Sequence, residues 1–336
     1  IIQGHLDSRN STNENVTDDA PGANDDASGV AAVMESARIL SKRKFGATLV
    51  FAALSGEEQG LSGGTILAAY AKAQGWEVLA VLNNDIVGNS KGLNGKVDDK
   101  TVRVFSEGIR ATETQQMASA RRSNGGELDS PSRNLSRYMA TIAEQHMKDF
   151  RVRMIYRMDR YGRGGDQTPH QEAGFPAIRV TEGAENWNHQ HQNVRTENGV
   201  FFGDTIEYVD FKYLANVTRL NAITMASLAS APRPPWEVRV QGALSDDTTV
   251  RWSPGKGPAA ARYVIWWRDT TSPVWQHSQD VAGTATEAVV KDVVLDDHIF
   301  GLQAVSAEGY ASPIQFAGLL GAFIPGAPAP APARTN

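Results

Sequence analysis

Continuous apolar runs alternate with segments of helical periodicity through the first two thirds of the chain, and this alternation restricts the fold more than any other feature. The apolar runs cover residues 1–4, 48–54, 78–85 and 177–181. Unbroken runs of this kind predict strands that are covered on both faces. Helices are expected over residues 30–40, 61–73, 135–150 and 210–228. We therefore predict an α/β fold in which a mostly parallel, mixed sheet is sandwiched by helices.

A proline-rich stretch at residues 231–235 separates this region from one of different composition. Five of the seven Trp residues follow it, at positions 236, 252, 266, 267 and 275. The runs around them are β-branched and aromatic, as in the short strands of a sandwich. We predict a first domain at residues 1–231, a linker at 232–236, a small all-β sandwich at 237–324 and a Pro/Ala-rich tail at 325–336. The chain opens on IIQG, which we interpret as a strand of an N-terminally incomplete domain.

Composition excludes several kinds of site and partner. The net charge is -5, which argues against a basic nucleic-acid surface. No apolar run approaches the roughly 20 residues of a membrane-spanning helix. Cysteine is absent, so a metal ion must be held by His, Asp and Glu side chains.

Polar motifs follow or flank the predicted strands. They are GHLDS at 4–8, PGANDDASG at 21–29, SGEEQG at 55–60, NND at 83–85 and NHQHQ at 188–192. In an open α/β sheet, ligands bind outside the carboxyl ends of the strands. The motifs would thus deliver nitrogen and oxygen ligands suited to zinc. The spacing of NHQHQ does not distinguish His189 from His191.

The charges of these groups favour two metal ions. Asp25, Glu58 and Asp85 supply three negative charges, and a bridging anion balances the fourth charge of two zinc ions. Glu57 is then free of metal and suited to act as general base. Asp7 lies two residues from His5, so in an extended segment its carboxylate can orient the imidazole.

In order and spacing, the five motifs resemble the co-catalytic di-zinc exopeptidases of the bacterial leucyl aminopeptidase and glutamate carboxypeptidase type. The resemblance covers about residues 1–230. It implies two zinc ions per chain, with these ligands: His5, Asp25 as the bridge, Glu58, Asp85 and His191. It also implies Glu57 as the general base and Asp7 as the acid that orients His5. Gln192 and Arg195 stand where family members usually carry Thr and Asp, which keeps His189 open as an alternative ligand.

The region after the proline-rich stretch resembles a fibronectin type III domain. The resemblance rests on Trp252, Tyr263 and Trp267 and on the FGL and YASP sequences at 300–302 and 310–313. We expect the aromatic residues to form a packed core. Because secreted enzymes often carry such modules, we expect a secreted or periplasmic protein whose C-terminal domain contacts other proteins or cell-surface material.

The sequence therefore predicts a zinc-dependent aminopeptidase that acts on peptide substrates. A carboxypeptidase is the nearest alternative, because Arg157, Arg160 or Arg163 could bind a substrate carboxylate. A single-zinc transferase similar to glutaminyl cyclases is a further alternative. From another class, the chain could be a non-catalytic binding or adhesion module with a vestigial metal site.

Overall fold

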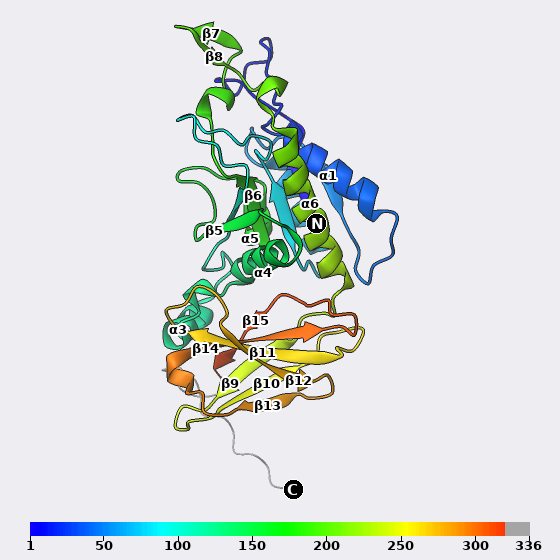
Figure 1. Cartoon of the computed structure of the whole chain (residues 1–336), viewed down its shortest axis with the longest axis vertical. Coiled ribbons are helices and arrows are strands. Elements are labelled where there is room, and N and C mark those ends of the chain that lie inside the picture. Colours follow the sequence, from blue (N-terminus) through cyan, green and yellow to red (C-terminus); the bar gives the residue numbers. More distant parts are fainter. Residues whose placement is uncertain (320–336) are drawn as a thin grey trace. The chain divides into compact units, whose positions relative to one another are not determined.

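The computed structural model describes residues 1–319, which fold as two compact units (Figure 1). The first unit comprises Ile1–Thr112 and Pro131–Ala229, and the second comprises Glu113–Ser130 and the described residues 230–319. The sequence pattern gave no sign that residues 113–130 group with the sandwich. Residues 320–324 of the predicted sandwich and the predicted tail at 325–336 lie outside the described residues.

The first unit is built on a six-stranded sheet with the strand order β2-β1-β3-β6-β4-β5. The strands are β1 (Ile2–His5), β2 (Phe51–Leu54), β3 (Val81–Asn84), β4 (Thr101–Phe105), β5 (Arg151–Ile155) and β6 (Ala177–Glu182). Neighbouring strands pair in parallel except β4 and β6, which are antiparallel. The predicted mostly parallel, mixed sheet is confirmed. Strands β4 and β5 were not predicted, because arginines interrupt their short apolar runs.

Helices cover both faces of this sheet. They are α1 (Ala27–Leu40), α2 (Ser62–Ala73), α4 (Pro131–His146), α5 (Gln167–Glu172) and α6 (Phe211–Ser230). Buried side chains of α1, α4 and α6 share one core with the sheet, among them Val33, Met139 and Val217. Asn84 bonds to Asn221 of α6, whereas its neighbour Asn83 donates to Gln167 of α5. Since adjacent strand residues point to opposite faces, α5 lies on the face opposite α6.

Two smaller features complete the first unit. Strands β7 (Arg195–Glu197) and β8 (Val200–Phe202) form a hairpin, and short 3-10 helices, η2 (Trp187–His189) and η3 (Ile206–Tyr208), lie on either side of it in the sequence. None of the helices described for residues 1–319 is both long and apolar enough to cross a membrane.

The second unit contains two four-stranded sheets, with orders β13-β10-β9-β16 and β12-β11-β14-β15. The strands are β9 (Trp236–Gln241), β10 (Thr248–Ser253), β11 (Arg262–Asp269), β12 (His277–Ala282), β13 (Glu287–Val290), β14 (His298–Val305), β15 (Gln315–Phe316) and β16 (Gly318–Leu319); η4 (Leu295–Asp297) precedes β14. Trp252 and Tyr263 pack in a common core with ring centroids 5.2 Å apart. The expected all-β sandwich and the core position of these aromatic residues are confirmed.

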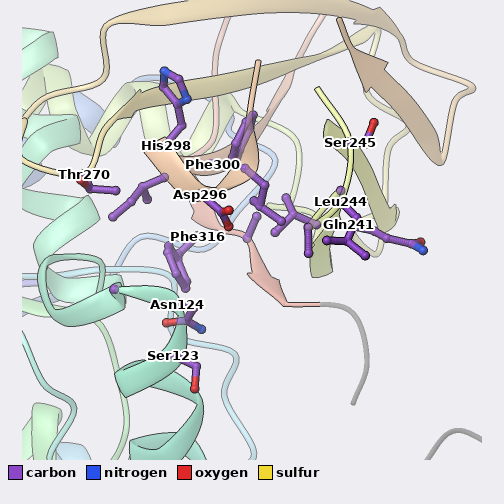
Figure 2. A pocket seen from close by; sticks show the side chains of 17 residues that line it. Ser123, Asn124, Gln241, Leu244, Ser245, Thr270, Asp296, His298, Phe300 and Phe316 are labelled. Atoms are coloured by element: carbon purple, nitrogen blue, oxygen red, sulfur yellow. The ribbon is translucent and has the colours of Figure 1, made fainter. Parts of the chain in front are cut away.

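Residues 113–130 pack within this second unit. They form α3 (Gln115–Asn124) and a 3-10 turn, η1 (Gly126–Leu128). Asp129 then forms a 2.6 Å ion pair with Arg268 of β11, and both side chains are fully buried. A pocket of about 820 Å³ is lined by the end of α3 and by Phe300 and Phe316 of the sandwich. Figure 2 shows the side chains that line it. The ion pair fixes this segment to the sandwich.

We expect Arg268→Met to destabilise the second unit by about 3–5 kcal/mol, because the carboxylate of Asp129 loses a fully buried ion-pair partner. Replacing both partners, as in Arg268→Met with Asp129→Leu, should restore part of that loss. Denaturant unfolding followed by tryptophan fluorescence reports mainly on this unit, since it holds five of the seven Trp residues, at positions 236, 252, 266, 267 and 275. A double variant no more stable than Arg268→Met would show that the ion pair does not fix the segment.

Candidate metal centre

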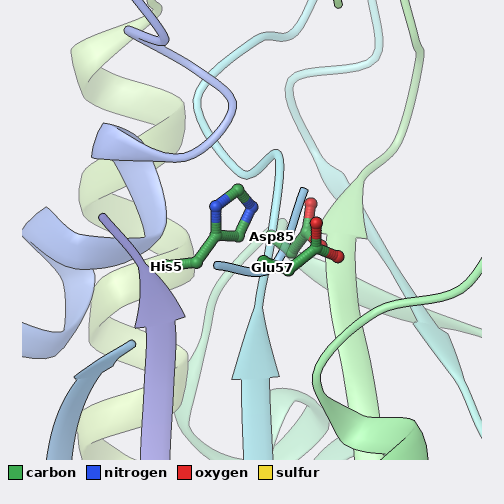
Figure 3. A group of neighbouring side chains, drawn as sticks. All are labelled: His5, Glu57 and Asp85. Carbon is green, nitrogen blue, oxygen red and sulfur yellow. The ribbon is translucent and has the colours of Figure 1, made fainter. Parts of the chain in front are cut away.

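Two groups of potential metal ligands lie beyond the carboxyl ends of β1, β2 and β3. In the first group, His5, Glu57 and Asp85 turn toward one another (Figure 3). The second group consists of Asp25, Glu58 and His191. Within each group, one ligand atom from each residue lies within 4.8 Å of the other two. The structure thus brings together the residues predicted as metal ligands and the residue predicted as general base.

Asp25 connects the two groups. Its Oδ1 atom lies 3.2 Å from Nε2 of His5, and its Oδ2 atom lies 2.8 Å from Nε2 of His191. The same His191 nitrogen lies 2.8 Å from Oε1 of Glu58. One buried carboxylate therefore presents one oxygen to each group, as a bridging ligand must.

The two histidines of the NHQHQ motif occupy different environments. His189 directs Nδ1 at the carbonyl oxygen of Gly203, 3.0 Å away, and its ring stacks on Tyr208 at 3.6 Å between centroids. His191 instead faces Asp25 and Glu58. The geometry thus favours His191 as the ligand, and its predicted role in metal binding stays a prediction.

Asp7 contacts both His5 and the Glu57–Glu58 pair. Its carbonyl oxygen lies 2.9 Å from Nδ1 of His5, whereas its carboxylate is 3.7 Å from that nitrogen. The carboxylate accepts the backbone N–H groups of Glu57 and Glu58, at 3.2 and 3.0 Å. The closest contact to the imidazole is therefore a main-chain oxygen, and the carboxylate also fixes the turn that carries both glutamates.

Asp26 holds three segments of the centre together. Its buried carboxylate accepts the backbone N–H groups of His5 and Gly29 at 3.0 Å and of Ile86 at 3.2 Å. Ile86 directly follows Asp85. A Cβ atom at position 29 would lie 2.4 Å from the Asp26 carboxylate, so only glycine permits this approach. The sequence alone did not indicate this role for Asp26.

Two arginines that sequence reasoning missed contact the candidate ligands. The fully buried Arg179 of β6 lies 2.5 Å from Asp85, and it donates to the carbonyl oxygen of Gly164 at 2.8 Å. Arg9 contacts Oε2 of Glu58 at 2.8 Å and Nδ1 of His191 at 2.6 Å. Arg179 had a sequence signal, because a charge inside an apolar strand needs a buried counter-charge. Arg9 had none, since it lies in a polar loop.

The crowding of carboxylates shifts the titration of the centre. Burial raises the pKa of Glu57 to about 8, and the negative charge of Asp85 adds to the effect. Burial alone would lower the pKa of His191, but its close contacts with the carboxylates of Asp25 and Glu58 raise it to about 9. The pKa of His5 is likewise raised far above its usual range, because bonds to Asp25 and Asp7 outweigh burial. The centre therefore attracts positive charge.

Zinc fits this donor set. Nε2 of His5 and Oε1 of Glu58 are buried, and neither forms a well-aligned hydrogen bond within residues 1–319. Each instead faces another candidate ligand, Asp25 Oδ1 at 3.2 Å and His191 Nε2 at 2.8 Å. Each belongs to one of the two groups of potential ligands. Imidazole nitrogens and carboxylate oxygens without any thiolate are ligands that zinc accepts. The fold and these groups define an α/β protein with a divalent-metal centre at the ends of parallel strands.

The chain belongs to peptidase family M28, whose model matches residues 1–199. A probable zinc metalloprotease of Leptosphaeria maculans is 45% identical over 316 residues, which cover 93% of this chain and 72% of that protein. A probable zinc metalloprotease of Pyrenophora tritici-repentis is 44% identical, and the match covers 93% of this chain and 65% of that protein. The chain thus spans about two thirds of the length of these relatives.

Two of the solved structures that match this chain are an aminopeptidase and an fn3 domain. The LapA aminopeptidase of Legionella pneumophila matches 68% of this chain and 50% of that chain, with 23% identity and a TM-score of 0.47. The fn3 domain of the human collagen alpha-1(XX) chain matches 26% of this chain and 84% of that chain, with 20% identity and a TM-score of 0.24.

We expect Asp26→Ala to lower the stability of the metal-free protein by about 3 kcal/mol, because three buried N–H groups lose their acceptor. Zinc binding should weaken as well, since Asp26 fixes the segments that carry His5 and Asp85. Denaturant unfolding and zinc titration measure the two effects.

Asp210→Ala is the matched control for this variant. Asp210 also accepts backbone N–H groups at the start of a helix, from Lys212 and Tyr213. Its loss should lower stability and leave zinc affinity unchanged. Equal zinc affinity in the Asp26 and Asp210 variants would contradict the role assigned to Asp26.

Proposed function

We propose that this chain is a zinc-dependent aminopeptidase that hydrolyses N-terminal peptide bonds with two zinc ions per chain. The observation that carries the proposal is the position of Asp25, with one carboxylate oxygen toward His5 and the other toward His191. His5 and Asp85 would hold one ion, and Glu58 and His191 would hold the other. Asp25 would serve both.

The bound zinc pair would supply the Lewis acidity that polarises a peptide carbonyl and activates water. Glu57 faces the same cleft and carries no metal in this assignment. It would take a proton from the attacking water and deliver it to the nitrogen of the leaving amine. The bond from its backbone N–H to Asp7 fixes the turn that positions this carboxylate.

The cleft supports action at a chain end. It has a volume of about 390 Å³, and its lining includes four of the candidate ligands, Asp25, Glu58, Asp85 and His191, together with Glu57, Arg9, Arg160 and Arg163. The free α-amine of a substrate could approach one of the two bound zinc ions, which would favour a chain end over an internal segment of chain. This supports an aminopeptidase.

A carboxypeptidase is the second candidate, and one observation favours it. Arg160 and Arg163 line the cleft, although each is also paired with Glu185 at 3.5 and 3.6 Å. Either guanidinium could bind a substrate carboxylate if it left Glu185. Hydrolysis of aminoacyl-anilides but not of N-blocked dipeptides would support the aminopeptidase, and the opposite pattern would support the carboxypeptidase.

We also propose that the sandwich is a fibronectin type III-like module and that the protein is secreted or periplasmic. The two four-stranded sheets and the aromatic core support the first point. The second follows only from the frequent use of such modules in secreted enzymes. Such a module would contact other proteins or cell-surface material.

We expect Glu57→Gln to retain zinc at the wild-type content while turnover drops by a factor on the order of 10²–10⁴, because the amide cannot accept the proton. Asp25→Ala should instead lose zinc, because both ions depend on it. Metal analysis and aminoacyl-anilide hydrolysis measured on the same samples separate these outcomes. Loss of zinc from Glu57→Gln would mean that Glu57 is a ligand.

A further inference from the structure

Glu182 is the last residue of β6, and its side chain is fully buried. Among the described residues, this side chain forms no hydrogen bond with a candidate metal ligand. Its Oε2 atom accepts from Nδ2 of Asn24 at 2.8 Å and from the backbone N–H of Asn89 at 3.1 Å. Its Oε1 atom accepts from Nδ2 of Asn89 at 3.3 Å and from Nε2 of Gln190 at 3.4 Å. Four N–H groups thus converge on one carboxylate.

The donors belong to the segments that deliver the candidate ligands. Asn24 directly precedes Asp25, and Gln190 directly precedes His191. Asn24 and Gln190 are each 4% exposed, so neither can replace its bond to Glu182 with a bond to solvent. The side chain of Glu182 therefore joins the two loops whose next residues meet at 2.8 Å, between Asp25 Oδ2 and His191 Nε2.

We propose that Glu182 is a positioning residue that sets the zinc affinity of the half of the centre formed by Glu58 and His191. This inference rests on the proposed two-zinc function. Glu182 acts through Asn24 and Gln190 by keeping Asp25 and His191 at the separation that a shared ion requires. Groups that orient metal ligands typically change metal affinity 10–100-fold when they are lost.

The carboxylate cannot be replaced by an amide without loss. The oxygen of a Gln side chain would accept hydrogen bonds from two of the four donors. Its NH₂ group would face the other two donors, and no hydrogen bond could form there. Rotation of the Gln190 amide does not repair the mismatch, because its oxygen already accepts from Arg163 at 3.3 Å. Asn89 is fixed in the same way, since its oxygen accepts the backbone N–H of Lys91.

The experiment is zinc titration of the full chain with Glu182→Gln, in competition with a chelator. Wild type should bind two ions, which tests the proposed function. Glu182→Gln should bind one ion as wild type does and the other 10–100-fold more weakly. His191→Ala should lose that same ion and serves as the reference for the affected half.

A swap variant tests the contact itself. In Glu182→Gln with Gln190→Glu, the new amide donates to the new carboxylate, and Arg163 keeps an acceptor, so part of the lost affinity should return. Thr218→Val is the control, since it removes one buried hydrogen bond inside α6, from Oγ1 to the carbonyl oxygen of Leu214 at 2.8 Å. It should leave both affinities unchanged.

Several results would overturn the inference. These are unchanged affinities in Glu182→Gln, weakening of the ion that His191→Ala retains, or equal weakening in Thr218→Val. If Glu182→Gln does not fold, Gln190→Met removes one of the four donors to Glu182, together with the acceptor of Arg163, and must weaken the same ion. If wild type binds fewer than two ions, the two-zinc function fails, and the inference is decided by whether Glu182→Gln weakens the ion that His191→Ala loses.

Discussion

The packing of several buried carboxylates at one edge of the sheet is the constraint on which the centre depends. Asp25, Glu57, Glu58 and Asp85 line one cleft, and each carboxylate requires counter-charge once it is removed from water. Arg179 and Arg9 supply part of this charge. The imidazole of His5 supplies more, since the surrounding acids raise its pKa. A pair of divalent ions would satisfy the same demand more fully.

A second set of acids shapes the centre without belonging to either group of candidate ligands. Asp7 holds the N–H groups of Glu57 and Glu58, and Asp26 holds those of His5 and Ile86. The carboxylate of Asp204 accepts the backbone N–H of Asp25 at 2.7 Å. Short loops that turn at strand ends leave backbone N–H groups unpaired, and in a buried site those groups need acceptors. The acids that surround the centre therefore stabilise the loops that the candidate ligands require.

The sequence predicted most of the fold because the relevant signals are local. Apolar runs marked three of the strands that end at the centre, and helical spacing marked α1, α2, α4 and α6. Strands β4 and β5 were missed, since Arg103 and Arg153 interrupt runs of only five residues. The grouping of residues 113–130 with the sandwich depends on the ion pair between Asp129 and Arg268, which are far apart in the sequence. No local pattern could indicate it.

The candidate site also divides into features with a local sequence signal and features that depend on the fold. The types of ligand and their order could be predicted from the sequence, because the motifs stand at or near strand ends. The preference for His191 over His189 required the fold, since the stacking of His189 on Tyr208 depends on η3 and the β7–β8 hairpin. Arg179 and Glu182 also escaped detection, because each is a single charged residue on β6 whose partners lie on other segments.

The two halves of the centre differ in what holds them. His5 ends β1 and Asp85 directly follows β3, so regular sheet hydrogen bonds position both, and Arg179 contacts Asp85 from a fully buried position. His191 lies in an irregular segment between η2 and β7, and Arg9, which contacts it, is 24% exposed. An irregular segment gains its order from side-chain bonds rather than from a ladder. The hydrogen bonds of Glu182 would thus position the half of the centre that contains His191, whereas the hydrogen bonds of the sheet position the other half.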